Sequence, residues 1–155
     1  DGKERHGMRY REEVRDLFSV PEEYGLVHCI SADFAMGKGI VVEFNRRFDM
    51  KRRLQRGYPD YLDRYRALES GGDCILEGRV FNLITKERYF HKPTIDTMRA
   101  ALERMREICW DAGVLHLAMP MIGAGLDRLP WEEVSAQIKS VFRETDVDIL
   151  VCRLK

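Results

Sequence analysis

A chain of 155 residues falls within the usual size range of one folded domain and is long enough to bury a hydrophobic core. Hydrophobic residues make up 45% of it and charged residues 34%, and no apolar run approaches the roughly 18 residues that a membrane span needs. The 26 basic and 26 acidic side chains cancel, so the overall charge gives no argument for bulk binding to nucleic acid. We therefore expect a soluble, monomeric protein that does not engage a membrane.

The polar start of the chain, residues 1–7, is assigned to a disordered leader or an expression remnant, and residues 8–155 to the domain. The chain has four cysteines, Cys29, Cys74, Cys109 and Cys152. None of them shows the Cys-x-x-Cys spacing of zinc or redox sites, so no metal site is predicted. Isolated cysteines in apolar elements are typical of reduced core thiols, which favours a cytoplasmic or nuclear protein.

Apolar periodicity predicts helices and strands that alternate through most of the chain. The predicted strands span 8–15, 26–30, 74–77, 80–84, 114–119 and 147–152, and the predicted helices span 40–56, 61–68, 93–112 and 130–142. In the first strand charged and apolar residues alternate, as in an edge strand, and Gly78-Arg79 predicts a tight hairpin turn. Such alternation of elements predicts a sheet enclosed between helical layers.

Two loops that contain glycines each follow a predicted buried strand. Loop 31–40 contains Gly37 and Gly39, and loop 120–129 contains Gly123 and Gly125. Glycine permits a positive φ and lets ligand phosphates approach bare backbone N–H groups, with the dipole of the following helix behind them. If the two strands are parallel neighbours, both loops lie at the edge of the sheet where open α/β folds bind ligands. The loops therefore predict an anion-binding cleft.

Asp127 and Lys86 are the candidates for chemistry at this cleft. A carboxylate is unfavourable beside a phosphate, so Asp127 either serves another part of the ligand as an acid or base, or caps the helix that Pro130 opens. Lys86 ends a predicted strand and points into the same cleft if that strand is central. On position alone, a solvated surface lysine is the commoner explanation.

Two other polar features have simpler explanations. His28 lies in a buried apolar run and is interpreted as a hydrogen-bonded core histidine, because no second metal ligand lies at a suitable spacing. The basic stretch from Arg46 to Arg56 is interpreted as a solvated helix face in preference to a contact with nucleic acid.

Six strings of residues occur in a specific order along the chain. They are Asp16-Leu17-Phe18, His28-Cys29-Ile30-Ser31, Met36-Gly37-Lys38-Gly39-Ile40, Leu83-Ile84-Thr85-Lys86, His91-Lys92-Pro93-Thr94 and the segment from Pro120 to Leu129. Together they resemble the macrodomain subgroup of terminal ADP-ribose protein glycohydrolase, also described as O-acetyl-ADP-ribose deacetylase. The similarity extends from about Tyr10 to Leu154 and fades only between Lys51 and Gly72.

The resemblance implies an α/β protein, namely a three-layer α/β/α macrodomain with a central mixed, mostly parallel sheet. It also implies an enzyme that removes mono-ADP-ribose from Glu and Asp side chains and deacetylates O-acetyl-ADP-ribose, without a cofactor. The lysine and aspartate that act in that subgroup as nucleophile and acid/base correspond here to Lys86 and Asp127. An amine can condense with the aldehyde of an opened distal ribose while a carboxylate shuttles protons, so these residue types suit the reaction.

The resemblance further implies which residues contact ADP-ribose. The implied contacts are Asp16, Leu17, Ser31, Met121, Ile122, Gly123, Ala124, Gly125, Leu126 and Leu154, and the first glycine loop adds Gly37 and Gly39. Asp16 matches the aspartate that meets the adenine amine. Met121 stands where a basic residue is expected and Ala124 where a small thiol is expected. The sequence Ser31-Ala32-Asp33 takes the place of the Asn-rich ribose motif of most macrodomains, as it does in this subgroup.

Two alternatives stay open. One is a module that binds ADP-ribose without cleaving it, although such a reader needs neither Lys86 nor Asp127. The other is an enzyme that acts on ADP-ribosylated nucleic acid, as related antitoxin macrodomains do, with the arginines of the basic stretch on the nucleic-acid backbone. The expected partners are ADP-ribose and ADP-ribosylated proteins, with ADP-ribosylated nucleic acid or poly(ADP-ribose) as the alternatives.

Overall fold

The structure, a computed structural model, describes residues 7–154. The predicted leader lies outside the described residues except for Gly7, whose backbone N–H donates to Asp146 Oδ1 at 3.0 Å. Within the described part of the chain, no helix has the length and apolar character required to cross a membrane.

One six-stranded sheet forms the centre of the molecule, in the order β1-β6-β5-β2-β4-β3. Its strands are β1 (Arg9–Val14), β2 (Gly25–Ser31), β3 (Asp73–Glu77), β4 (Val80–Lys86), β5 (His116–Met119) and β6 (Asp148–Arg153). All neighbouring strands are parallel except β3 and β4, which form the predicted antiparallel hairpin with Gly78 at φ +61° in its turn. The predicted mixed, mostly parallel sheet is confirmed, and β1 is an edge strand as its alternating residues indicated.

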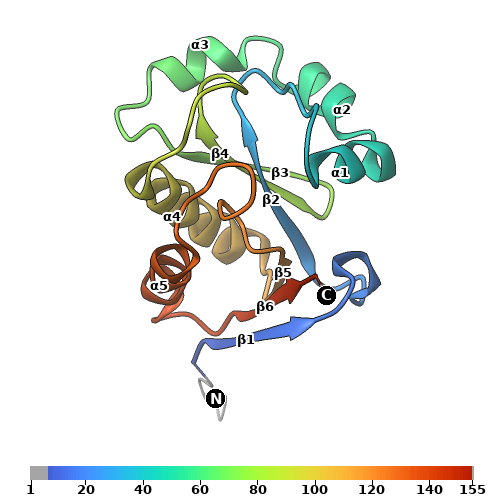
Figure 1. The fold of residues 1–155 in the computed structure, drawn as a ribbon, viewed down its shortest axis with the longest axis vertical. Coiled ribbons are helices and arrows are strands. Elements are labelled where there is room, and N and C mark those ends of the chain that lie inside the picture. Colours follow the sequence, from blue (N-terminus) through green and yellow to red (C-terminus); the bar gives the residue numbers. More distant parts are fainter. Residues whose placement is uncertain (1–6, 155) are drawn as a thin grey trace.

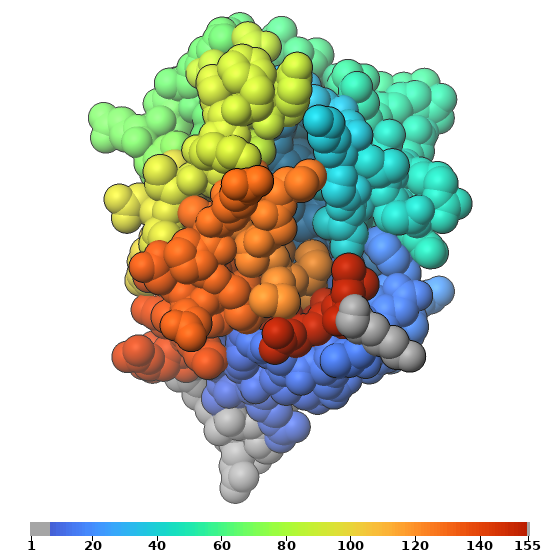
Figure 2. Space-filling model, in the orientation of Figure 1, coloured from blue at the N-terminus to red at the C-terminus, as the bar shows by residue number. Residues whose placement is uncertain are grey.

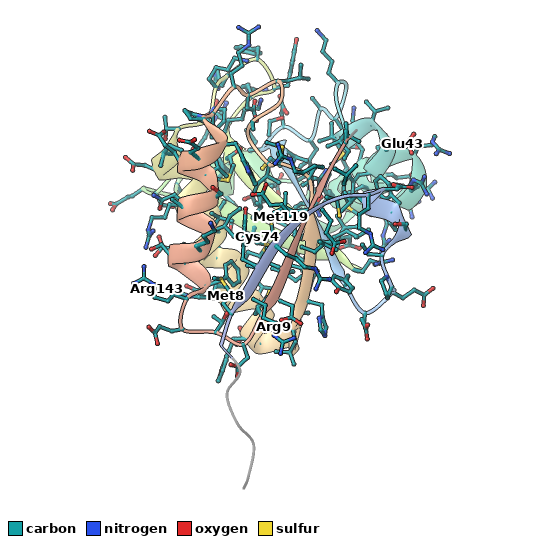
Figure 3. All side chains as sticks on the ribbon, turned by 60° about the horizontal axis from the view of Figure 1, so that its bottom comes forward. Met8, Arg9, Glu43, Cys74, Met119 and Arg143 are labelled. Atoms are coloured by element: carbon teal, nitrogen blue, oxygen red, sulfur yellow. The ribbon has the colours of Figure 1, made fainter. Side chains whose placement is uncertain are left out.

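Helices cover both faces of the sheet (Figure 1). One face carries α4 (Ile95–Ala112) and α5 (Trp131–Phe142), and the other carries the 3₁₀ helix η1 (Leu17–Ser19), α1 (Val41–Phe48), α2 (Met50–Gly57) and α3 (Tyr61–Arg66). Each helical layer has its own hydrophobic cluster against the sheet. In Figure 3, Cys74 and Met119 lie in the interior, whereas Glu43 and Arg143 point outward on opposite sides. The three-layer α/β/α architecture is therefore confirmed.

The longest helix begins and ends where its sequence signals predict. The Thr94 side chain accepts from the backbone N–H of Thr97, and the Thr97 side chain accepts from the backbone N–H of Thr94, which forms a capping box. At the other end Gly113 adopts φ +68°, the left-handed conformation that terminates helices at low steric cost for glycine. Met98, Leu102 and Met105 are fully buried between these ends.

The prediction of one continuous helix over 40–56 is wrong, because Asp49 adopts a left-handed conformation at φ +52° and separates α1 from α2. Phe44 and Met50, both fully buried, belong to the same hydrophobic cluster. In an uninterrupted helix they would be about 120° apart around the axis, at roughly 100° per residue. The break at Asp49 turns both side chains toward the sheet. The stretch 51–72, where the resemblance fades, thus forms α2 and α3 on this face.

His28 is a core residue, as expected. Its Nε2 lies 2.5 Å from Asn82 Oδ1, and its ring stacks on Phe44 with centroids 3.9 Å apart. Burial lowers the pKa of His28 to about 4, although the hydrogen bond with Asn82 opposes this shift. The Nδ1 atom has no hydrogen-bond partner among residues 7–154, so the imidazole is satisfied on one side only.

Candidate active site

A cavity of about 1500 Å³ opens at the carboxyl-terminal edge of the parallel strands. Its wall comes from the segments that follow β1, β2, β4, β5 and β6. These five strands are mutually parallel, so their carboxyl ends meet at one edge. Figure 2 shows the hollow between the segments 35–45 and 120–128, with the segment 87–92 at its upper end and the carboxyl-terminal residues at its lower end.

Lys86 and Asp127 form an ion pair in the wall of this cavity. Lys86 Nζ donates to Asp127 Oδ1 at 2.7 Å, and the side chain of each residue is 14% exposed. β4 places the lysine at its last residue, next to Ser31 of β2, where the register between the two strands shifts. The prediction that both charged residues face one cleft is confirmed. The alternative that Asp127 caps the next helix is wrong, because α5 begins at Trp131 without a side-chain cap hydrogen bond and the Asp127 carboxylate accepts from Lys86 instead.

The second glycine loop folds back on itself through backbone hydrogen bonds. The N–H of Leu129 donates to the carbonyl of Gly123 at 2.7 Å, and the N–H of Arg128 donates to the carbonyl of Gly125 at 3.1 Å. Gly123 has φ +73°, and a Cβ atom added there would lie 2.8 Å from Met98 Cε. The left-handed backbone therefore favours glycine at this position, and the approach of a phosphate to the Gly123 backbone stays a prediction. At Gly125, the other glycine of this loop, an added Cβ would meet no atom within 4 Å.

The two glycine loops meet across the cavity. A Cβ atom on Gly39, which has φ +79°, would lie 3.2 Å from Leu126 Cδ1. In the same loop as Gly39, the Asp33 carboxylate accepts from the Ser31 hydroxyl, from the N–H of Ala35 at 3.1 Å and from the N–H of Tyr89 at 3.0 Å. Asp33 thereby fixes the segment after β4 to the segment after β2, and both contribute to the cavity wall.

The opposite end of the cavity is built around η1. The Asp16 carboxylate caps this short helix by accepting from the N–H of Phe18 at 3.0 Å, and Leu17 is buried beside it. The Arg47 guanidinium lies 4.3 Å from the centroid of the Phe18 ring. The sequence does not single out Phe18 as a site residue, although the string Asp16-Leu17-Phe18 contains it. Leu154, which is 88% exposed, completes this end.

The structure places all the predicted site residues on the wall of this one cavity. They are Asp16, Leu17, Ser31, Gly37, Gly39, Lys86, Met121, Ile122, Gly123, Ala124, Gly125, Leu126, Asp127 and Leu154. The role of each residue stays a prediction. Sequence reasoning also overlooks Lys92, which lines the cavity and donates from Nζ to the carbonyl of Leu126 at 2.9 Å, just before Asp127.

The thiol of Cys29 lies close to the ion pair. Burial raises its pKa strongly, the charge of Asp127 raises it further, and the charge of Lys86 opposes this rise. Cys29 therefore stays a protonated thiol at neutral pH and is a poor nucleophile. Between Gly7 and Leu154, no three His, Cys, Asp or Glu side chains are grouped as metal ligands would be.

The basic stretch is largely paired within its own surface. Glu43 accepts hydrogen bonds from Arg46 and from Arg47, and Arg53 forms an ion pair with Glu77. These contacts support the interpretation of a solvated helix face and reduce the positive charge available to a nucleic-acid backbone.

No family model matches the chain. The ADP-ribose glycohydrolase OARD1 of Bos taurus is 44% identical over 151 residues, which cover 96% of this chain and 93% of the relative. OARD1 of Homo sapiens is 42% identical over 151 residues, with the same coverage of both chains. The macrodomain of Thermus aquaticus DarG superposes with a TM-score of 0.73 at 24% identity, over 94% of this chain and 99% of that one, and this likeness concerns the fold alone.

Proposed function

Since this chain belongs to the macrodomain family of the ADP-ribose glycohydrolase OARD1, we propose that it removes mono-ADP-ribose from Glu and Asp side chains of modified proteins. We propose in addition that the same site deacetylates O-acetyl-ADP-ribose. The observation that carries the proposal is the ion pair of Lys86 and Asp127, 2.7 Å apart and mostly shielded from solvent in a cavity large enough for a dinucleotide-sized ligand. Free cysteines, three of them buried, support a cytoplasmic or nuclear location.

The proposed orientation of ADP-ribose follows from the two ends of the cavity. Asp16 and Leu17 lie at the end that would hold adenine, where a carboxylate can accept from the exocyclic amine. The glycine loops between the ends would hold the diphosphate, with Gly37 and Gly125 offering backbone that no side chain covers. The distal ribose would then lie at Lys86 and Asp127, next to the segment 87–92 (Figure 2).

In the first proposed step, Asp127 accepts a proton from the Lys86 ammonium group and so frees the lone pair of Nζ. This lone pair attacks C1″ of the distal ribose. The bond from C1″ to the ester oxygen breaks with its electron pair, and the departing carboxylate takes the proton from Asp127. Asp127 then accepts the second proton that the attacking nitrogen loses. A glycosylamine on Lys86 results, and the modified protein leaves with its carboxyl group restored.

In the second proposed step, the ring oxygen leaves C1″ with the electron pair of their bond and takes the N–H proton of the glycosylamine, which leaves an imine, and Asp127 then protonates the imine nitrogen. Water adds to C1″ and gives one proton to Asp127, which passes it to the nitrogen. The bond between C1″ and nitrogen then breaks with its electron pair on nitrogen, while the C1″ hydroxyl gives its proton to Asp127, which passes it to Nζ, and the resulting aldehyde closes again with the ring hydroxyl. Free ADP-ribose leaves, and the ion pair of Lys86 and Asp127 is restored. Each proton that Asp127 handles moves over the 2.7 Å of the observed contact or to a group bound beside it.

Two measurements on the same samples test this function. Lys86→Ala should still bind ADP-ribose but should not release it from a glutamate-linked peptide, since the cavity is intact and only the covalent step is lost. Borohydride reduction during turnover should add one ADP-ribosyl mass to the peptide that contains Lys86. Lys139→Ala, at a surface lysine outside the cavity, is the matched control. Normal turnover by Lys86→Ala would replace the lysine nucleophile with a water activated by Asp127.

A further inference from the structure

Tyr89 and Phe90 form an exposed aromatic pair at the end of the cavity where Lys86 lies. Their exposed fractions are 64% and 65%, and both line the cavity. Of the ten exposed large hydrophobic residues among residues 7–154, five line this cavity, including Leu126 and Ile40. Single exposed apolar side chains are ordinary, but their concentration around one opening marks a contact surface.

The backbone that carries the aromatic pair is held in place. The N–H of Tyr89 donates to Asp33 Oδ2 at 3.0 Å, and the N–H of Arg88 donates to His91 Nδ1 at 3.2 Å. Next along the segment, Lys92 is bonded to the carbonyl of Leu126. Large rings on a fixed backbone lose little conformational entropy when a partner covers them, as in other rigid aromatic contact surfaces.

We propose that Tyr89 and Phe90 contact the polypeptide that flanks the ADP-ribosylated residue and so determine which modified proteins are processed. This inference rests on the proposed function. If ADP-ribose fills the cavity with its distal ribose at Lys86, the bond to be cleaved lies beside Lys86, which precedes Tyr89 by three positions in the chain. The acceptor must then leave the cavity past the aromatic pair. In this proposed orientation ADP-ribose ends at its distal ribose beside Lys86, so the exposed rings beyond it would serve the acceptor.

The geometry of the rings favours a polypeptide over a nucleic acid. The planes of Tyr89 and Phe90 are 86° apart, with centroids separated by 5.3 Å, and Phe90 meets His91 at 68°. Consecutive bases of a single strand lie in near-parallel planes, so two perpendicular rings cannot stack on both of them. Perpendicular rings form a wedge instead, and a wedge suits the side chains that project from an extended polypeptide.

The experiment compares three substrates that share ADP-ribose and differ in the acceptor: a glutamate-linked ADP-ribosyl peptide, O-acetyl-ADP-ribose and an ADP-ribosylated oligonucleotide. In the double variant Tyr89→Ala, Phe90→Ala we expect kcat/KM on the peptide to fall by about tenfold or more, as removal of two aromatic contacts predicts. Turnover of O-acetyl-ADP-ribose and the affinity for free ADP-ribose should not change. Trp110→Ala, which removes an 87% exposed aromatic residue far along α4 from the cavity, is the matched control and should behave as the unmutated protein.

The outcomes separate the inference from the function on which it rests. If the unmutated protein turns over neither ester, the proposed function is wrong and this inference is wrong with it. If it turns over both esters and the double variant loses nothing on the peptide, or loses as much on O-acetyl-ADP-ribose, the aromatic pair does not read the polypeptide. A loss confined to the oligonucleotide would assign the pair to nucleic acid and would overturn the proposal.

Discussion

Gly123 and Gly125 are two residues apart in one loop, yet the structure predicts opposite consequences when each is replaced by valine. At Gly123 the left-handed backbone, φ +73°, costs an L-residue roughly 1 to 2 kcal/mol. The Cβ would also lie 2.8 Å from Met98 Cε, and overpacking of this kind costs about 1 to 3 kcal/mol. Gly123→Val should therefore lower the free energy of unfolding by about 2 to 5 kcal/mol.

In a domain of this length, each kcal/mol lowers the melting temperature by about 2 to 4 °C, so Gly123→Val should melt roughly 5 to 20 °C below the unmutated protein. Gly125→Val should melt within about 2 °C of it, because no atom lies within 4 Å of the added Cβ. The same Cβ branch stands where the diphosphate would approach the backbone. The dissociation constant for ADP-ribose should therefore rise about tenfold or more, which corresponds to about 1.4 kcal/mol.

Differential scanning fluorimetry with and without ADP-ribose measures both effects on the same samples, and isothermal titration calorimetry gives the affinities. The two variants control for each other, because each carries the same substitution in the same loop. Unchanged affinity in a stable Gly125→Val variant would refute the assignment of this loop to the diphosphate. An unchanged melting temperature in Gly123→Val would refute the argument from packing against Met98.

Three further predictions concern charged and polar residues. Lys86→Ala and Asp127→Ala should each lower kcat by about a hundredfold or more. Because both residues serve the same step, kcat of the double variant should be only slightly lower than that of the less active single variant. Losses that add up in single-turnover assays would contradict this prediction. The pKa of His28 falls from 6.5 to about 4 on folding, so the unfolded chain binds this proton more readily and the free energy of unfolding should drop by roughly 3 kcal/mol as the pH falls from 6.5 to 4. In urea unfolding, His28→Gln should therefore show a shallower dependence of stability on pH than the unmutated protein. The same pH dependence in both proteins would show that His28 is not its cause. Lys92→Met should lower kcat several-fold with little change in ADP-ribose affinity, because the loop before Asp127 loses the hydrogen bond from Lys92 to the Leu126 carbonyl. An unchanged kcat in steady-state kinetics would show that Lys92 does not position Asp127.

Sequence reasoning located the candidate site because the site follows from topology. Lys86 and Asp127 lie 2.7 Å apart because Lys86 ends one strand of the parallel part of the sheet and Asp127 follows another, and the carboxyl ends of such strands meet at one edge. The helix boundaries at Thr94 and Gly113 could also be predicted from the sequence, because capping residues act over a few neighbouring positions.

Features that depend on contacts between distant parts of the chain could not be predicted from the sequence. The turn at Asp49 depends on the need to bury Met50 against the sheet, and local periodicity shows nothing of the sheet. The contact between Gly123 and Met98, 25 positions earlier, could not be inferred from local sequence. The bond from Lys92 to the Leu126 carbonyl joins two segments 34 positions apart, so it too needed the folded structure.

The pairing of β1 with β6 has a consequence for the order in which the site can be assembled. Arg9 lies opposite Asp148, so the first described strand must find the last one across almost the entire chain. Asp16 and Leu17 directly follow β1, whereas Lys86 ends β4, which needs only the nearby β3 and β2 as neighbours. Contacts between such distant positions form late and slowly in folding. During synthesis, the reactive end of the cavity can therefore form before the end that would hold adenine, and binding competence is acquired only when β6 has emerged and closed the sheet.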